Sequence, residues 1–173
     1  MTEQFTNPRT GAWVRPLEGE ADLTIERLMK PGTGKADAHV HFDFDERFEV
    51  LEGTGTIVVD RRERELAAGE SVELPRRTPH RNLYNPGSED LRFRLTLSPR
   101  TEFADAFLSA LRHHMERGTV NAQGEFPNLQ LLATLHGTRA KSYLAGPPIW
   151  LQKPVLPVGA LIARLRGYRP RYD

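Results

Sequence analysis

Two histidines and a glutamate stand close together at the start of a segment with the pattern of β-structure. His39 and His41 are one residue apart, and Glu46 follows them ahead of an apolar run that ends at Gly53. Alternate residues of a strand point the same way, about 6.6 to 6.8 Å apart, so the two imidazoles share one face. Glu46 is an odd number of residues from His41 and needs a turn or bulge before its carboxylate can face the same point. His80, which follows the turn sequence PRRTP, is a third imidazole that can join them.

Three neutral imidazoles and one carboxylate are donors that iron(II), manganese, nickel, cobalt, zinc and copper all accept. Four protein ligands leave one or two coordination positions for chemistry or for capture of a ligand. The chain has no cysteine, which excludes a thiolate-bound zinc or iron–sulfur site. The sequence therefore predicts a divalent transition metal on nitrogen and oxygen ligands. Glu49 and Glu52 are alternative carboxylates, but Glu49 alternates with Phe48 and is expected to face solvent.

The elements that must position these ligands are short strands. Between Leu23 and Pro99, alternating or β-branched runs are separated by glycine- and proline-containing turns, a pattern typical of an antiparallel sandwich or barrel. The predicted strands are residues 23–29, 39–42, 47–53, 56–60, 62–68, 71–75, 80–85 and 91–98.

After Pro99 the apolar period changes from that of a strand to that of a helix. We expect one helix capped by Thr101 and ended by Gly118, and a second from Pro127 to Gly137. The apolar tail from Pro147 is interrupted by prolines, which predicts a kinked or split helical segment.

Two segments carry a resemblance to the cupin family. HVHFDFDERFEVLEG resembles the first cupin motif, with His39, His41, Glu46 and Gly53 matching position by position. GESVELPRRTPHRNLYN, which contains His80, resembles the second motif, although an arginine stands where that motif usually has glycine. The opening NPRTGAWVRPL and the ending LRGYRPRY resemble small bacterial single-domain cupins with a helical extension after the barrel.

The resemblance implies an all-β fold, the cupin double-stranded β-helix or jelly-roll barrel, with a C-terminal α-helical extension. It implies an N-terminal extension at residues 1–20 and a barrel at residues 21–100. Residues 101–173 would form the helical extension, packed on the barrel or at a dimer interface. It also implies that the metal ligands are His39, His41, Glu46 and His80.

The expected function is that of a metal-dependent enzyme acting on a small organic molecule. Iron or copper would suit a dioxygenase, whereas zinc, manganese or nickel would suit an isomerase or cyclase, with Glu46 as a possible base. Phe42, Phe48 and Tyr84 are candidates for the wall of a substrate pocket. The alternatives are a non-catalytic module that binds or senses a small ligand, and an interaction protein whose working surface is the tail.

The amino-acid composition limits the kinds of partner that the protein is expected to bind. The 173 residues include 24 basic and 23 acidic side chains, so no field of one sign draws in nucleic acid. The amino terminus lacks the pattern of a secretory signal, and the longest apolar run, VLPVGALIA, is about half of what a membrane span requires. We therefore expect a cytoplasmic protein without a transmembrane segment, and a homodimer. The basic and apolar tail is expected to dock on the barrel or a second copy rather than on an anionic membrane.

Overall fold

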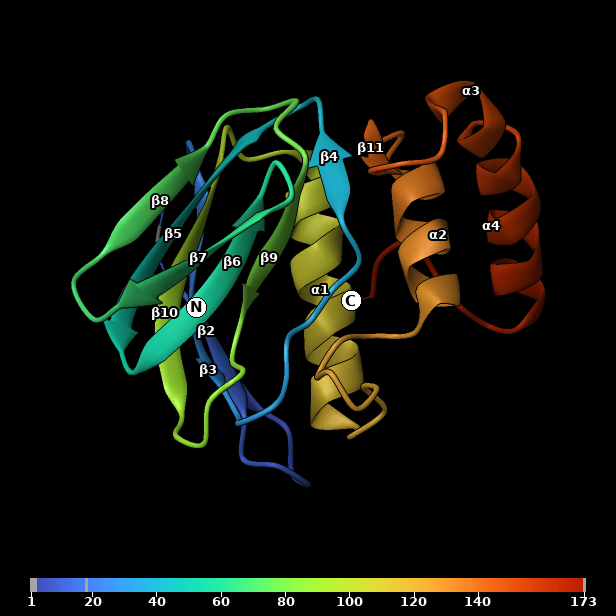
Figure 1. The fold of residues 1–173 in the computed structure, drawn as a ribbon. Coiled ribbons are helices and arrows are strands. Elements are labelled where there is room, and N and C mark those ends of the chain that lie inside the picture. Colours follow the sequence, from blue (N-terminus) through green and yellow to red (C-terminus); the bar gives the residue numbers. More distant parts are fainter. Residues whose placement is uncertain (1–2, 18, 173) are drawn as a thin grey trace.

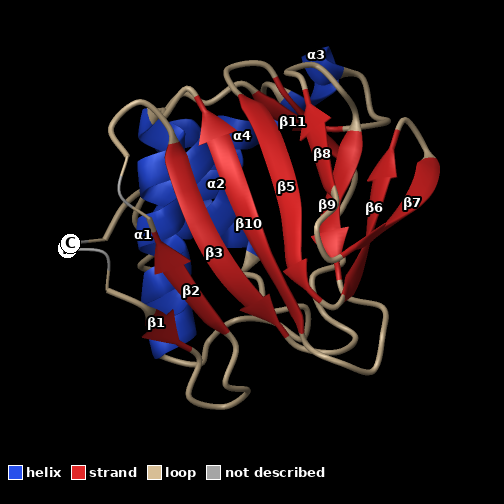
Figure 2. Ribbon diagram, turned by 90° about the vertical axis from the view of Figure 1, so that its left-hand side faces the viewer, coloured by secondary structure: helices blue, strands red, loops and turns tan. Residues whose placement is uncertain are grey.

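The strands form two antiparallel sheets that face each other (Figures 1 and 2). The computed structural model describes residues 3–17 and 19–172. One sheet has the order β1-β2-β3-β10-β5-β8 and the other has the order β11-β4-β9-β6-β7. This confirms the predicted jelly-roll architecture. The strands are β1 (Phe5–Thr6), β2 (Trp13–Pro16), β3 (Leu23–Met29), β4 (His39–His41), β5 (Asp45–Glu52), β6 (Thr54–Val59), β7 (Arg62–Ala67), β8 (Ser71–Leu74), β9 (His80–Tyr84), β10 (Leu91–Ser98) and β11 (Ser142–Leu144).

The central strand β10 shows why this sequence forms a two-layered structure. Its residues alternate between buried and half-buried positions along its whole length. Phe93 and Leu95 point into the core between the sheets, whereas Arg92 and Arg94 point out and pair with glutamates of neighbouring strands. A period of two places every second side chain on the same face. The eight strands predicted between residues 23 and 98 are all present, with end points that differ by at most two residues.

Gly53 makes the tight connection between β5 and β6. Its φ is +80°, a conformation that residues with a side chain rarely adopt. A Cβ atom there would lie 2.5 Å from the carbonyl oxygen of Asp90. Glycine is therefore required at this position both for the turn and for the close approach of the loop that leads into β10.

Three short strands lie outside the predicted set. β1 and β2 pair with each other, and β2 pairs with β3, so residues ahead of position 21 extend the six-stranded sheet. β11 pairs with β4 and completes the edge of the other sheet. Runs of two to four residues carry too little periodicity for a sequence prediction. The three-part division of the chain, with a boundary at residue 21, stays a prediction.

The helices follow the predicted positions. α1 (Glu102–Glu116) is capped by the Thr101 hydroxyl, which accepts from the Ala104 amide at 3.2 Å, and α2 (Asn128–Gly137) follows Pro127. The tail is split into α3 (Ile149–Gln152) and α4 (Val155–Leu165). α1 lies along the barrel, α2 stands between α1 and α4, and α4 is outermost (Figure 1).

The tail leaves a group of large apolar side chains in solvent. These are Leu144, Trp150, Leu151, Val155, Val158, Leu161, Ile162 and Leu165. No helix among the described residues has both the length and the apolar character to cross a bilayer.

Candidate metal centre

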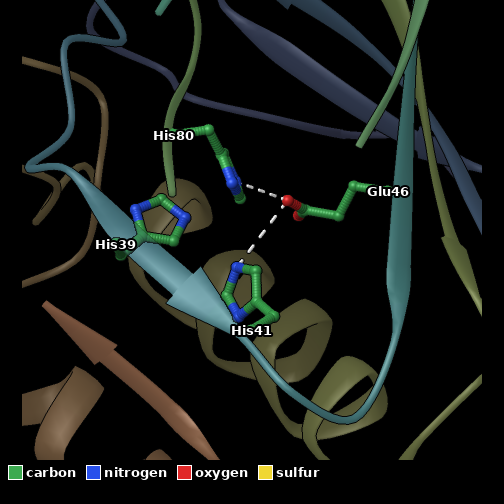
Figure 3. A group of neighbouring side chains, drawn as sticks. All are labelled: His39, His41, Glu46 and His80. Carbon is green, nitrogen blue, oxygen red and sulfur yellow. Dashed lines mark ion pairs between the residues drawn. The ribbon is translucent and has the colours of Figure 1, made fainter. Parts of the chain in front are cut away.

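The four predicted ligands come together from both sheets (Figure 3). His39 and His41 lie on β4, and His80 begins β9, where it is the direct cross-strand partner of His39. Glu46 reaches the group from β5 in the opposite sheet. One nitrogen from each imidazole and one oxygen from the carboxylate all lie within 4.8 Å of one another.

The odd spacing between His41 and Glu46 is explained by a change of sheet. The chain bends at Phe42 and Asp43 and leaves β4, then enters β5 two residues later. The carboxylate consequently faces the imidazoles from across the barrel rather than from the same strand. The sequence requirement for a turn or bulge is met by this bend.

The turn before His80 keeps a glycine-like backbone without a glycine. Arg77 has a φ of 73°, and its amide donates a hydrogen bond of 2.6 Å to the carbonyl of His41. A non-glycine residue in this region is strained, and such strain persists only where surrounding contacts hold it. The hydrogen bond ties the turn to β4, so the arginine leaves the two histidine-bearing segments in register.

A hydrogen-bond partner on Nδ1 orients each histidine of the group. The Nδ1 atom of His39 lies 2.7 Å from the carbonyl oxygen of Asp37, and that of His80 lies 2.9 Å from the carbonyl oxygen of Thr78. Because a carbonyl can only accept, each of these Nδ1 atoms carries a proton, and in the neutral ring Nε2 is the atom with the free lone pair. Partners of this kind orient metal-binding histidines in known sites.

The corresponding partner of His41 comes from the C-terminal part of the chain. Its Nδ1 atom lies 2.6 Å from the hydroxyl oxygen of Ser142, in a buried contact. Ser142 is on β11, directly opposite His41 in the β11–β4 pair. Sequence reasoning missed this residue, because a single serine about a hundred positions away carries no recognisable signal.

Among the described residues, the carboxylate and imidazole atoms at the centre face one another. Glu46 Oε2 lies 2.7 Å from His80 Nε2 and 3.7 Å from His41 Nε2. Within the described residues, neither Glu46 Oε2 nor His80 Nε2 makes a hydrogen bond of good geometry, although both are buried. Buried polar atoms are normally satisfied, and lone pairs that point at a carboxylate need a cation between them. The donor set therefore fits a divalent transition metal.

Burial controls the protonation of the two β4 histidines. It lowers the pKa of His41 to about 3 and also lowers the pKa of His39. Both rings are therefore neutral near pH 7. Neutral imidazole is the form that binds a metal.

Glu46 and His80 influence each other in the opposite sense. Burial acts to lower the pKa of His80, but the neighbouring Glu46 carboxylate raises it above its ordinary value. Burial acts to raise the pKa of Glu46, but His41, His80 and His39 lower it to about 2. Without a metal, a proton on His80 can occupy the place next to the carboxylate that a cation would take.

Aromatic rings close the site on the His41 side. The His41 ring stacks on Phe44 with centroids 4.4 Å apart, and Phe44 stacks on Phe103 at 5.8 Å. Phe44 is in the bend after β4, and Phe103 is in the first turn of α1. Neither residue was predicted to belong to the site.

The three predicted pocket residues do not share one place. Phe48 is buried in the core on the same face of β5 as Glu46, and its ring lies 6.1 Å from that of Phe93. Phe42 is half-buried beside Tyr143, and Tyr84 is buried at the opposite end of β9 from His80. Their role as a substrate wall stays a prediction.

The alternative carboxylates serve other interactions. Glu49 pairs with Arg94 at 3.1 Å, and Glu52 pairs with Arg92. Glu49 points away from the core, as its alternation with Phe48 indicated, and Glu52 is exposed at the end of β5. The geometry therefore favours Glu46 as the carboxylate ligand among the acidic residues of β5.

A groove of about 720 Å³ lies along the six-stranded sheet. Thr24, Arg94 and Thr96, which alternate with core residues, line it together with Glu46. None of the three histidines is among the described residues that form its wall.

The strand order, the two motif segments and the clustered ligands all point to one family. The family model described as the cupin domain matches residues 25–98. This barrel is a cupin domain. The match includes all four residues of the candidate metal centre, while β1, β2, β11 and the helices lie outside it.

Solved cupin structures are similar to part of this chain. A cupin-superfamily sugar phosphate isomerase from Silicibacter pomeroyi is 20% identical over 58% of this chain and 73% of its own, with a TM-score of 0.49. A Cupin 2 conserved barrel domain protein from Salinispora arenicola is 21% identical over 51% and 76% of the two chains, with a TM-score of 0.44. A predicted oxalate decarboxylase from Thermotoga maritima is 22% identical over 57% and 91%, with a TM-score of 0.45. No protein of curated function matches the sequence.

Proposed function

We propose that this cupin is a metal-dependent enzyme that acts on a small organic molecule. His39, His41, Glu46 and His80 would hold a divalent transition metal in the barrel. The observation that carries the proposal is the convergence of four ligand atoms from the two sheets within 4.8 Å of one another, with Nδ1 of each histidine already engaged.

The donor set limits the chemistry without selecting one reaction. When bound, iron or copper would supply oxygen chemistry of the dioxygenase type, whereas zinc, manganese or nickel would polarise a carbonyl or enol for isomerisation or cyclisation. The protein contributes the orientation of the ligands and a dry wall made by Phe44 and Phe103.

The charge state of Glu46 favours a ligand role over a role as the base. A pKa of about 2 keeps the carboxylate ionised and makes it a weak acceptor of substrate protons near neutral pH. An ionised carboxylate is the form that a metal requires. Its further use as a catalytic base stays a prediction, as do the expected homodimer and cytoplasmic location.

The first test is the metal content of the protein purified without chelator or added metal. We expect close to one equivalent of a transition metal per chain in the natural sequence and a large loss in His80→Ala. His136→Ala is the matched control, since His136 is exposed at the end of α2 and outside the cluster. Circular dichroism must show that both variants keep the folded barrel.

Retention of a full equivalent by a folded His80→Ala protein would refute the ligand assignment. The metal-loaded protein is then incubated with a panel of small carbonyl compounds, sugars and aromatic diols. Turnover of any of them supports the enzyme. Tight binding with every ligand recovered unchanged would instead show a non-catalytic binding module.

A further inference from the structure

Helix α4 is apolar on two sides, one buried and one exposed. Gly159 and Ala163 are buried on the side that faces α2, where a Cβ on Gly159 would come within 2.6 Å of the Leu132 side chain. Val158, Ile162 and Leu165 follow a spacing of three and four residues and therefore share the other side. A helix that is hydrophobic all round is normally buried. Among the described residues, no other part of the chain covers the outer side of α4.

Helix α3 extends this apolar surface. Trp150 is 71% exposed and Leu151 is 47% exposed. α3 contacts α4 and stands at its amino-terminal end (Figure 1). We call the exposed apolar side chains of α3 and α4 the tail face. A tryptophan at the edge of an apolar surface is typical of segments that sit at a lipid–water boundary.

Positive charge is concentrated around the tail face. Residues 139–173 contain seven basic side chains and one acidic side chain, whereas residues 1–138 contain 17 basic and 22 acidic ones. The near-neutral chain is therefore divided into an acidic part with a net charge of −5 and a basic part with a net charge of +6. Lys153, Arg164 and Arg166 are exposed beside the apolar stripe. Within the described residues, only Lys141 of the seven has a carboxylate partner, Asp43 at 3.7 Å.

A basic groove adjoins the tail face. It has a volume of about 440 Å³ and lies between the end of α2, β11 and the start of α4. Arg139, Lys141 and Lys153 line it together with the apolar side chains of Leu156 and Pro157. Cationic groups over an apolar floor match the phosphate and the first carbons of a phospholipid.

A second copy of the chain is a poor match for this surface. All the large hydrophobic side chains that the described residues leave exposed lie between Leu144 and Leu165, so the barrel offers no complementary apolar patch. A dimer through the tail face would have to be isologous, with the same patch on both copies. That arrangement would bring the basic rims of the two copies together. Like charges across an interface oppose association.

We propose that the tail face binds the surface of an anionic lipid bilayer, with α4 lying in the plane of the interface. The apolar stripe would enter the acyl boundary, while the basic rim would contact the phosphates, as interfacial amphipathic helices do. This inference is independent of the metal centre. It reverses the sequence-based preference for docking on protein, because the folded chain leaves the stripe uncovered and places uncompensated cations beside it.

The test uses the full-length protein with Trp13→Phe, which makes Trp150 the sole tryptophan. Vesicles of equal parts phosphatidylcholine and phosphatidylglycerol are compared with pure phosphatidylcholine vesicles. We expect co-sedimentation and a blue shift of the Trp150 emission with the anionic vesicles, weakening as salt is raised. Inorganic phosphate at the same concentration should produce no shift, which separates a lipid surface from a free phosphate ligand.

Two double variants locate the binding surface. Val158→Glu with Ile162→Glu should abolish binding, and Arg164→Glu with Arg166→Glu should weaken the partition coefficient at least about tenfold. Arg62→Glu with Arg64→Glu, on the exposed strand β7, makes the same change in charge and should have no comparable effect. All these side chains are exposed or half-exposed, and melting curves confirm that the variants fold.

Three outcomes would overturn the proposal. One is equal binding to neutral and anionic vesicles, and another is the absence of binding to both. The third is a dimer in light scattering that Val158→Glu with Ile162→Glu converts to a monomer, since the tail face would then be an interface between copies.

Discussion

The candidate metal centre depends on residues that would never touch the metal. The carbonyl groups of Asp37 and Thr78 fix the tautomers of His39 and His80, whereas His41 relies on the Ser142 hydroxyl. A backbone carbonyl cannot be removed by substitution, but a hydroxyl can. Ser142 is therefore the point at which the orientation of one ligand can be tested without altering the ligand itself.

Replacement of Ser142 with alanine should weaken metal binding by about 10- to 100-fold, because loss of such a partner frees the imidazole to rotate and exchange tautomers. The dissociation constant is measured by competition with a chromophoric chelator. Ser71→Ala is the control, since among the described residues the Ser71 hydroxyl is hydrogen-bonded to Arg47 alone, on the exposed side of the sheet. An unchanged dissociation constant in Ser142→Ala would show that Phe44 stacking alone positions His41.

At the scale of elements, α1 is part of the barrel's core rather than an addition to it. Phe103 and Leu111 belong to the same buried cluster as Phe48 of β5 and Phe93 of β10. Thr101 is the N-cap, so α1 begins at Glu102. Its first turn therefore places Phe103 against Phe44 and near His41. Helix start and site closure are thereby coupled.

Phe103→Ala should lower the free energy of unfolding by about 3 to 5 kcal/mol, which is the usual cost of removing a buried aromatic ring and leaving a cavity. Urea denaturation followed by circular dichroism measures it. Trp150→Ala removes an even larger ring from an exposed position and should change the free energy by no more than about 0.5 kcal/mol. A small effect in Phe103→Ala would mean that α1 packs loosely on the barrel.

For the molecule as a whole, the barrel depends on the segment that follows it in the chain. The segment after residue 100 supplies β11 to the edge of β4, Ser142 to His41, and buried side chains of α1 to the common core. The tail itself is further tied by the Tyr172 hydroxyl, which donates to Gln130 of α2 at 2.7 Å. The outer face of α4, by contrast, contributes nothing to the barrel.

A chain that ends after residue 100 should therefore fail to form a stable, metal-binding barrel. Its core would lack Phe103 and Leu111, so the side chains that pack on them would be exposed to solvent. Strand β4 would also lose its pairing with β11. Solubility, the dispersion of amide signals in nuclear magnetic resonance spectra, and metal content report this. A soluble, folded fragment that binds a full equivalent of metal would show that the helices are dispensable for the site.

Features that depend on short-range patterns could be predicted from the amino-acid sequence. Alternation and turn residues located the eight strands from β3 to β10, and proline, threonine and glycine positions located the helices. The spacing of His39, His41 and Glu46, together with His80, identified a group that the fold does bring together. Such patterns are readable because strand and helix periods act over a few residues.

Features that depend on contacts between distant parts of the chain became visible in the folded protein alone. The fold paired β11 with β4 and so placed Ser142 beside His41, and it moved Glu46 to the opposite sheet. It also chose which side of α4 is buried: Gly159 allows one side to approach α2, and this leaves Val158 and Ile162 in solvent. An apolar helix reads the same in sequence whether one side or both are covered, because burial is a property of neighbours that come from elsewhere in the chain.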